Sequence, residues 1–247
     1  MSSMSRTLAQ PGRLQDRAVS ARPAQAFEPA PVSAIAMADQ SRGRVEPASE
    51  PLSSGRIGPN AVLQLIPALA DAGGQRLVER VFAEAAASDL LEHPPQTMVD
   101  QARVRMLFAA VQQICDPPLC QAIMTDAGTR TGAYILANRI PALAQSLLKR
   151  LPVRLARRLL AFAIAKNAWT FAGTGRVTIF YGRPLVLSIA DNPIAIRSEA
   201  GPSACVWHEA VISTLFRALA GPDTVIRETH CCAAGDSDCR FEIGPSR

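Results

Sequence analysis

The sequence predicts an α+β protein in which N-terminal helices pack on a small, mainly antiparallel sheet. Two observations carry this prediction. From about residue 60 to residue 171, apolar side chains recur every three or four positions, as on one face of a helix. After Phe171 the period becomes two, because Val177, Ile179 and Tyr181 alternate with their neighbours as they do in a strand. A run of helices followed by a run of strands is typical of α+β folds.

The first 55 residues are expected to form a disordered tail. They are rich in Ala, Ser, Pro and Arg and show neither a helical nor a strand period. Such a segment buries too little apolar surface to offset the entropy that it loses on ordering. Residues 56–247 are expected to form a single domain, with a helical part over 56–171 and an α+β part over 172–247.

Glycine and proline divide the helical part into segments. Helical periodicity covers 60–69, 77–85, 98–115, 119–126, 131–140 and 141–171. Asn60 is the expected N-cap of the first segment, and Gly73-Gly74 is the expected break after it. Pro117-Pro118 suits the first turn of a helix, and Pro152 is expected to kink or restart the last one.

The α+β part follows the order strand, strand, helix, strand, strand. The expected segments are strands at 177–181 and 185–190, a helix at 204–220, and strands at 224–232 and 239–243. Gly182-Arg183-Pro184 turns the chain between the first two strands, and Gly221-Pro222-Asp223 ends the helix. Strands joined by short turns pair antiparallel, so we expect a mainly antiparallel sheet.

The charge of the chain is unevenly distributed. The net charge is +5, yet residues 127–190 contain ten Lys and Arg and no Asp or Glu. The remaining residues hold 16 basic and 21 acidic groups. A basic segment of this kind can touch anionic lipid through an amphipathic helix. Nucleic acid is not an expected partner, because no recognition motif or series of stacking aromatic residues accompanies the basic segment.

The sequence also indicates the compartment. No run of about 18 uninterrupted apolar residues is present, so we expect no membrane-spanning helix. The N-terminus lacks the apolar run of a secretory signal, and the six cysteines therefore indicate a reducing compartment. We expect a cytoplasmic protein, with peripheral contact to the photosynthetic membrane if the family resemblance described below is correct.

The cysteines form the most specific pattern in the chain. In the expected layout Cys205 begins the last helix, Glu228 and Cys231 end the third strand, and Cys239 begins the fourth. A helix start, a strand end and a hairpin return can meet at one point. Three thiolates and one carboxylate there make a four-ligand tetrahedral zinc site. The alternatives are reduced structural thiols and a redox pair, while Cys115 and Cys120 are expected to be buried, inert thiols.

The C-terminal segment resembles the 4-vinyl-reductase domain family, whose hallmark is a terminal Glu-x-x-Cys…Gly…Cys-x-Phe signature. The same domain forms the sensor module of phenol-responsive bacterial regulators. There a Cys at the start of the preceding helix, the Glu-x-x-Cys pair and a further Cys hold zinc. This pattern falls on Cys205, Glu228, Cys231 and Cys239 here without a gap. The resemblance covers about residues 60–247.

Two neighbours of the signature leave the ligand set open. Cys232 and His230 are near enough in sequence to replace one of the four ligands. With four protein ligands, a zinc ion has no open position for catalysis, so the zinc is expected to be structural. The family also implies a fold similar to that of the Golgi-tethering subunits, and a homodimer.

Within the family, the chain is most similar to the bacteriochlorophyll 4-vinyl reductases. The resemblance implies reduction of the 8-vinyl group of a divinyl protochlorophyllide-type intermediate, with NADPH as cofactor if the protein is a reductase. No dinucleotide fingerprint supports this, because Gly173-Thr-Gly175 precedes a strand and lacks a third Gly. The competing hypothesis is a non-enzymatic carrier that binds the tetrapyrrole and delivers it to a biosynthetic enzyme. Catalytic residues are not identified under either hypothesis.

A sheet backed by helices can enclose an apolar pocket. The candidate ligand-binding residues are Arg154, Arg157, Arg158, Trp169, Phe171, Tyr181 and His208. Arginine pairs well with the acidic substituents of a chlorophyll precursor, and aromatic side chains suit its flat macrocycle. His208 is expected on the surface or at the edge of the pocket. The same arginines also fit a solvated helix face.

Overall fold

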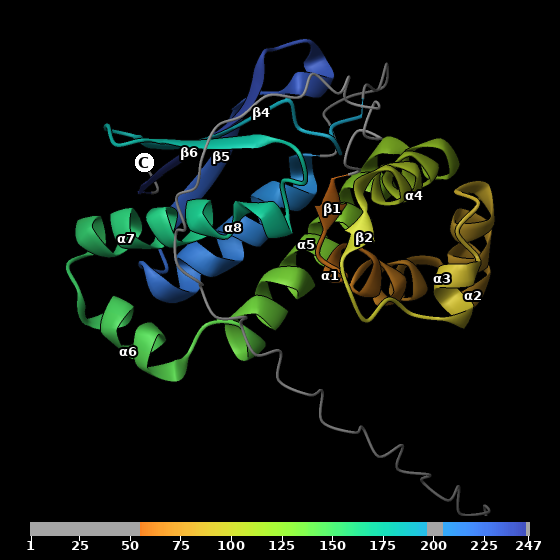
Figure 1. Ribbon diagram of the computed structural model, residues 1–247, viewed down its shortest axis with the longest axis horizontal. Coiled ribbons are helices and arrows are strands. Elements are labelled where there is room, and N and C mark those ends of the chain that lie inside the picture. Colours follow the sequence, from red (N-terminus) through yellow and green to blue (C-terminus); the bar gives the residue numbers. More distant parts are fainter. Residues whose placement is uncertain (1–54, 197–204, 246–247) are drawn as a thin grey trace, which may run out of the picture. The chain divides into compact units, whose positions relative to one another are not determined.

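The computed structural model describes residues 55–196 and 205–245, in which helices precede and pack on a four-stranded antiparallel sheet (Figure 1). The α+β prediction is confirmed. The predicted tail lies, apart from Gly55, outside the described residues, so its disorder stays a prediction. No helix among the described residues has the length and apolar character needed to cross a membrane.

The helices before the sheet are α1 (Asn60–Leu63), α2 (Leu65–Glu84), α3 (Asp89–Glu92), α4 (Gln101–Ile114), α5 (Pro117–Asn138), α6 (Ala142–Arg150) and α7 (Val153–Lys166). Asn60 is the first residue of α1 and makes no side-chain cap, which corrects the predicted N-cap. The predicted break at Gly73-Gly74 is a kink within α2, where Gly74 has a φ of +69°. This left-handed conformation favours glycine because a Cβ would be strained there.

Three other boundaries differ from the prediction. Residues 119–140 belong mainly to one helix, α5, whose side-chain cap Asp116 accepts a hydrogen bond from the Leu119 N–H at 2.9 Å. The helix predicted to reach residue 171 ends at Lys166 and is followed by the 3-10 turn η1 (Ala168–Thr170). A small sheet of β1 (Arg56–Ile57) and β2 (Val99–Asp100) was not predicted, because two-residue strands show no period.

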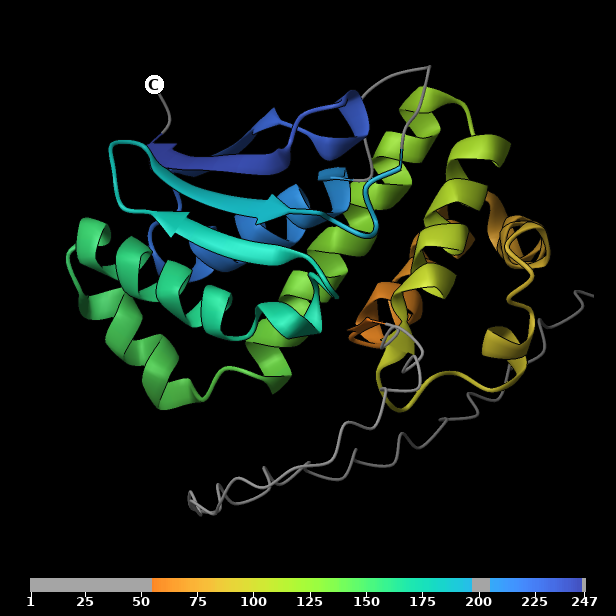
Figure 2. The same cartoon turned by 45° about the horizontal axis from the view of Figure 1, so that its top comes forward.

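The main sheet has the strand order β3-β4-β6-β5, and all of its neighbouring strands are antiparallel. The strands are β3 (Arg176–Phe180), β4 (Leu185–Ala190), β5 (Thr224–His230) and β6 (Asp238–Pro245), with α8 (Cys205–Leu219) between β4 and β5. Figure 2 shows α8 lying along one face of this sheet. Leu187, Ile189 and Phe241 are buried in the core, and Phe216 of α8 is buried with them.

Helix α5 packs closely against α8, and two glycines set their separation. A Cβ added at Gly128 would lie 2.5 Å from the carbonyl oxygen of Trp207. One added at Gly132 would lie 2.7 Å from the Cβ of Thr214. Both distances are shorter than van der Waals contact, so the two helices can approach this closely only where α5 lacks side chains. The glycine that suggested a gap in the sequence is therefore a packing residue in a continuous helix.

We predict that Gly128→Ala lowers the free energy of unfolding by about 1–3 kcal/mol, because the methyl group forces α5 away from α8. Urea denaturation followed by circular dichroism measures the change. The control is Gly244→Ala, since a Cβ there meets nothing within 4 Å. It is expected to stay within about 1 kcal/mol of the parent protein. Equal effects of the two substitutions would contradict the packing role of Gly128.

Candidate metal centre

Four side chains, contributed by one helix and two strands, form the candidate metal centre. Cys205, Glu228, Cys231 and Cys239 each place one ligand atom within 4.8 Å of the others. The Sγ of Cys205 lies 3.3 Å from that of Cys231 and 3.2 Å from that of Cys239. The three cysteines are buried and Glu228 is half-buried. The structure thus brings together the four residues that the sequence pattern indicated, in a cluster that can hold a metal ion.

The ligands come from separate elements of the fold. Cys205 is the first residue of α8, and Cys239 lies near the start of β6, paired with Ile189 of the central strand β4. Glu228 lies in β5, paired with Phe241 on the inner face of the sheet. Its backbone N–H donates to the Glu209 carboxylate of α8 at 3.1 Å. The strand is thereby tied to α8 at the level of the cluster.

A β-bulge makes the Glu-x-x-Cys spacing compatible with a strand. Side chains alternate between faces, so residues three apart in a regular strand point to opposite sides. Here the pairing steps from Glu228↔Phe241 to His230↔Arg240, which leaves Thr229 as the extra residue. The bulge returns the next inward position to Cys231, and both ligands then face the cluster.

The loop from β5 to β6 is held by hydrogen bonds that converge on the cluster. Asp236 accepts a hydrogen bond from the Cys231 N–H at 2.8 Å, and the Cys232 N–H points at the Cys239 sulfur at 3.4 Å. Between them the 3-10 turn η2 (Cys232–Ala234) ends at Gly235, whose φ is +102°. This left-handed position favours glycine and accounts for the Gly of the sequence signature.

Asn192 is a cluster neighbour that the sequence analysis missed. Its side chain is buried, and its Nδ2 lies 3.5 Å from the Cys239 sulfur and 3.9 Å from the Cys205 sulfur. Its Oδ1 accepts a hydrogen bond from the Ile194 N–H at 3.3 Å. Such an amide donor stabilises negative charge on the sulfurs. The sequence marks it only as part of the turn that ends a strand.

The proximity of the sulfurs disfavours their ionisation. The pKa of Cys205 is raised above its usual range, chiefly by hydrogen bonding with Cys231 and Cys239 and further by burial. The pKa of Cys239 is raised to about 12; hydrogen bonding with Cys205 lowers it, but that with Cys231 and burial raise it more. A cation reverses this balance, because a coordinating thiol is deprotonated. Metal binding at this cluster therefore releases protons.

The two substitute ligands lie outside the cluster. The sulfur of Cys232 lies 3.9 Å from the carbonyl oxygen of Ile189. His230 is exposed, and its Nδ1 lies 3.2 Å from the Thr229 hydroxyl. Of the other cysteines, Cys115 is buried and Cys120 is half-buried, and burial raises the pKa of the Cys120 thiol to about 11.

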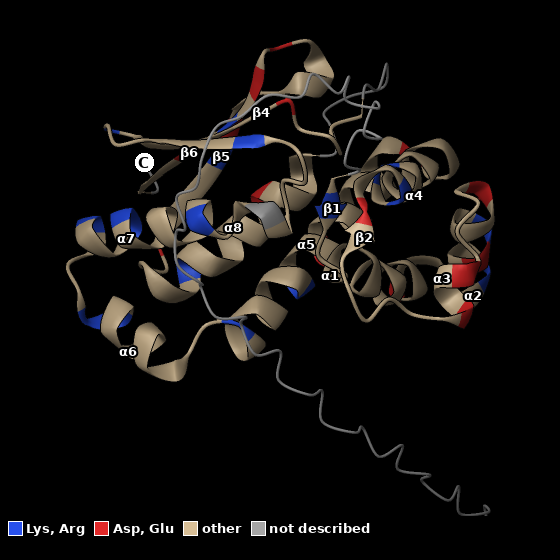
Figure 3. Cartoon of the chain, viewed as in Figure 1, with Lys and Arg blue, Asp and Glu red and all other residues tan. Residues whose placement is uncertain are grey.

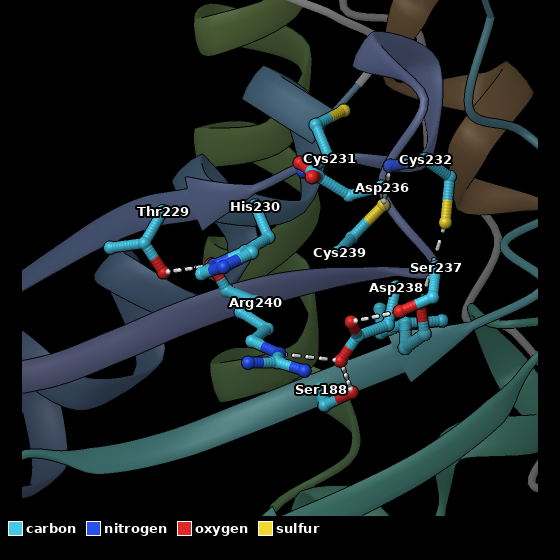
Figure 4. A network of polar contacts seen from close by, with 11 residues as sticks. Ser188, Thr229, His230, Cys231, Cys232, Asp236, Ser237, Asp238, Cys239 and Arg240 are labelled. Carbon is cyan, nitrogen blue, oxygen red and sulfur yellow. Dashed lines mark hydrogen bonds and ion pairs between the residues drawn. The ribbon is translucent and has the colours of Figure 1, made fainter.

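A buried carboxylate braces the strands beside the cluster. Asp238 precedes Cys239, and its carboxylate accepts hydrogen bonds from Arg240 at 2.8 Å, Ser188 at 2.5 Å and Ser237 at 3.0 Å (Figure 4). These bonds, with that from Arg240 the strongest influence, hold the pKa of Asp238 at about 2 against the opposing effect of burial. They link β6 to β4 on the face of the sheet opposite the core.

The predicted ligand-binding residues do not meet in one pocket. Arg154 and Arg158 are exposed on α7, and Tyr181 is exposed at the end of β3. Arg157 is half-buried and donates to the Thr224 hydroxyl at 2.9 Å. The side chain of Trp169 lies outside the described part of the chain.

His208 corrects a prediction, because it lies neither on the surface nor at a pocket edge. It is 1% exposed, and the rings of Phe171, Trp207 and Phe241 surround it with centroids 5.1–6.2 Å away. Its Nε2 lies 3.4 Å from the carbonyl oxygen of Phe171. Burial lowers the pKa of His208 to about 4, and the hydrogen bond with Phe171 opposes this shift. Packed aromatic side chains fill this part of the fold.

Two open hollows of about 260 Å³ occur among the described residues. One lies between α6, α7 and the end of α8, and the other lies on the sheet beside Phe180, His230 and Arg240. None of the predicted ligand-binding residues lines either hollow. Both are smaller than the roughly 300–1,000 Å³ of typical ligand pockets.

Comparison with known proteins identifies the family. The family model of the 4-vinyl-reductase domain matches residues 185–245, from β4 to the end of β6, and so includes all four cluster residues. The bacteriochlorophyll synthase 23 kDa chain of Cereibacter sphaeroides is 44% identical over 195 residues, covering 79% of this chain and 93% of the relative. The chain belongs to the 4-vinyl-reductase domain family. The predicted family membership is therefore confirmed.

A second relative and two solved structures are similar to this 4-vinyl-reductase-domain protein. The bacteriochlorophyll synthase 23 kDa chain of Rhodobacter capsulatus is 37% identical over 190 residues, covering 77% of this chain and 87% of the relative. An H-NOX protein from S. oneidensis in the Fe(II)NO state aligns with a TM-score of 0.44 at 12% identity, over 77% of this chain and 100% of that one. A triple mutant described in the Fe(II) state gives 0.41 at 13% identity, over 77% and 97%. TM-scores this low do not bear on function.

We predict that Asp238→Asn lowers the free energy of unfolding by about 1–3 kcal/mol at pH 7, because a charge-assisted network is lost. The folded pKa lies below that of an unfolded Asp, so this stabilisation is complete above about pH 4 and is lost as the pH falls toward about 2. Urea denaturation of both proteins at pH 7 and about pH 3 measures the difference. The control is Asp191→Asn, because its ion pair with Arg176 is exposed and should contribute less than about 1 kcal/mol. A loss no larger than that of the control would refute the bracing role.

Proposed function

We propose that this 4-vinyl-reductase-domain protein acts in bacteriochlorophyll biosynthesis, where it binds a divinyl protochlorophyllide-type tetrapyrrole and catalyses reduction of its 8-vinyl group to ethyl. The observation that carries the proposal is the 44% identity to a bacteriochlorophyll synthase 23 kDa chain over 93% of that relative's length. This match extends beyond the family domain, so the N-terminal helices share the likeness. The predicted homodimer and cytoplasmic location are parts of the same proposal.

The proposed reaction adds one hydride and one proton across the vinyl double bond. NADPH is the proposed reductant, and it supplies the hydride. The chain supplies cations for the substrate: Arg154 and Arg158 are exposed on α7 and are free of the contact that occupies Arg157. Guanidinium groups bind carboxylate substituents in a bidentate manner, which would orient the macrocycle.

A carrier that hands the tetrapyrrole to a biosynthetic enzyme is the second candidate function. The geometry of the metal cluster favours it. Four protein ligands complete a tetrahedral shell, so a metal held there has no position left for a substrate. In this case the metal stabilises the fold, and the pigment binds elsewhere on the protein without reacting.

We also infer that the cluster holds one structural zinc ion. Thiolates and carboxylates are common zinc ligands. A zinc ion with bonds of about 2.3 Å to sulfur separates its ligands by about 3.8 Å. The four ligand atoms here, all within 4.8 Å of one another, form a shell of that size. The zinc would fasten the start of α8 to the facing ends of β5 and β6.

The reductase and the carrier are separated by one incubation. Purified protein is mixed with divinyl protochlorophyllide and NADPH, and the pigment is followed by chromatography and absorbance. The reductase predicts an ethyl product that accumulates beyond one equivalent per chain. Tight binding with unchanged pigment over the same period would contradict the reductase and support the carrier. Absence of both binding and conversion would contradict both functions.

Metal analysis tests the zinc proposal. Protein purified without added zinc should contain about one zinc per chain, and Cys239→Ser should lose it because one of four ligands is removed. The structural contribution of such a site is large, so the variant should also melt at a lower temperature. The controls Cys232→Ser and Cys120→Ser should keep the metal, since neither thiol belongs to the cluster. Zinc retained by Cys239→Ser, or its absence from the parent protein, would refute the assignment.

A further inference from the structure

Helices α6 and α7 expose more apolar surface than their packing explains. None of the nine residues of α6 is buried, and Leu143 and Leu147, one turn apart, are 86% and 60% exposed. On α7, the buried Ala156, Leu160 and Ile164 define the face that packs inward. Outside that face, α7 carries large apolar side chains that are 42–51% exposed, namely Leu155, Leu159 and Phe162.

The same two helices carry exposed positive charge and no negative charge. Their exposed cations are Lys149, Arg150, Arg154, Arg158 and Lys166. Figure 3 shows blue segments and no red ones on α6 and α7. The Nζ of Lys166 lies 5.3 Å from the centre of the Phe162 ring, so cationic and apolar groups share one surface. We call the exposed apolar residues and these five cations the α6–α7 surface.

Arg157 does not belong to this surface. Its guanidinium donates to the Thr224 hydroxyl, and the negative charge that acts on it comes from Asp223, beyond the end of α8. The five cations of the α6–α7 surface make no ion pair with a described residue. Their charge is therefore available to a partner.

We propose that the α6–α7 surface docks on a lipid bilayer with anionic head groups. Leucine and phenylalanine side chains gain free energy by entering the boundary between head groups and acyl chains, while Lys and Arg at the same level pair with lipid phosphates. A bilayer satisfies both halves of the surface at once. Charge complementarity selects an anionic bilayer over a neutral one.

Charge also argues against a second copy of the chain as the occupant. Two α6–α7 surfaces brought face to face would juxtapose the five cations of each copy with no acid between them, and like charges oppose such contact. The apolar area would be covered, but the basic groups would lose water without gaining counter-charges. A bilayer rich in phosphatidylglycerol supplies those counter-charges.

Cosedimentation of the full chain with vesicles tests the proposal. The vesicles contain either phosphatidylcholine alone or phosphatidylcholine with about one third phosphatidylglycerol, and neither tetrapyrrole nor NADPH is present. Binding to the anionic vesicles is expected at low salt, to weaken severalfold at about 0.5 M salt, and to be far weaker on neutral vesicles. The outcome is independent of the proposed function, because no pigment takes part.

Two pairs of variants locate the contact. Arg154→Gln with Arg158→Gln should weaken binding by about 20-fold, since each cation near an anionic surface contributes about fivefold. Leu159→Gln with Phe162→Gln should weaken it by about tenfold or more through lost apolar insertion. The matched controls are Arg76→Gln with Arg80→Gln on α2, and Met106→Gln on α4, which are exposed positions elsewhere. The controls should bind as the parent protein does.

Three results would overturn the proposal. The first is a parent protein that does not sediment with anionic vesicles. The second is α6–α7 variants that bind as tightly as their controls while all proteins keep the same circular dichroism spectrum. The third is a dimer in analytical ultracentrifugation that the Leu159 and Phe162 substitutions convert to monomer without any vesicle binding, which would assign the surface to a second copy.

Discussion

The convergence of three sulfur atoms on the start of α8 is the constraint on which the C-terminal half of the fold depends. The Cys205 sulfur lies 3.3 Å from that of Cys231 and 3.2 Å from that of Cys239, so a helix, a strand end and a hairpin return must meet at one place. Buried thiols this close repel one another once ionised, and a cation removes that penalty. The bulge in β5, the left-handed Gly235 and the amide of Asn192 all serve to hold this arrangement.

The helical half and the sheet are joined through α8. One side of α8 packs against the sheet and begins at the cluster, and another side accepts the glycines of α5. Because Gly128 meets the backbone of Trp207, the position of α5 is fixed close in sequence to the first metal ligand, Cys205. The rings of Phe108 and Trp207 pack beside this crossing with centroids 5.8 Å apart, and both are buried. The large apolar side chains left exposed are found mainly on α6 and α7.

Features that depend on local periodicity could be predicted from the sequence. The alternation in β3 and the turn residues after β4 and α8 predicted the order of strands, and the spacing of Cys205, Glu228, Cys231 and Cys239 predicted which side chains come together. Features that depend on tertiary contact could not. Gly128 resembles a helix break until α8 is known to pack against it. Asn192 lies in an ordinary turn sequence, and His208 gives no sign that three aromatic rings enclose it.

The bulge at Thr229 has a consequence for how the chain tolerates insertions and deletions. In most strands near a surface loop, the loss of one residue shifts the register and is absorbed by the turn that follows. Here the extra residue decides whether position 231 points inward, so deletion of Thr229 would restore strict alternation and turn that thiol out to solvent. A protected sulfur would become one that peroxide can reach and oxidise. The length of this strand, and not only the identity of its cysteines, is therefore under chemical constraint.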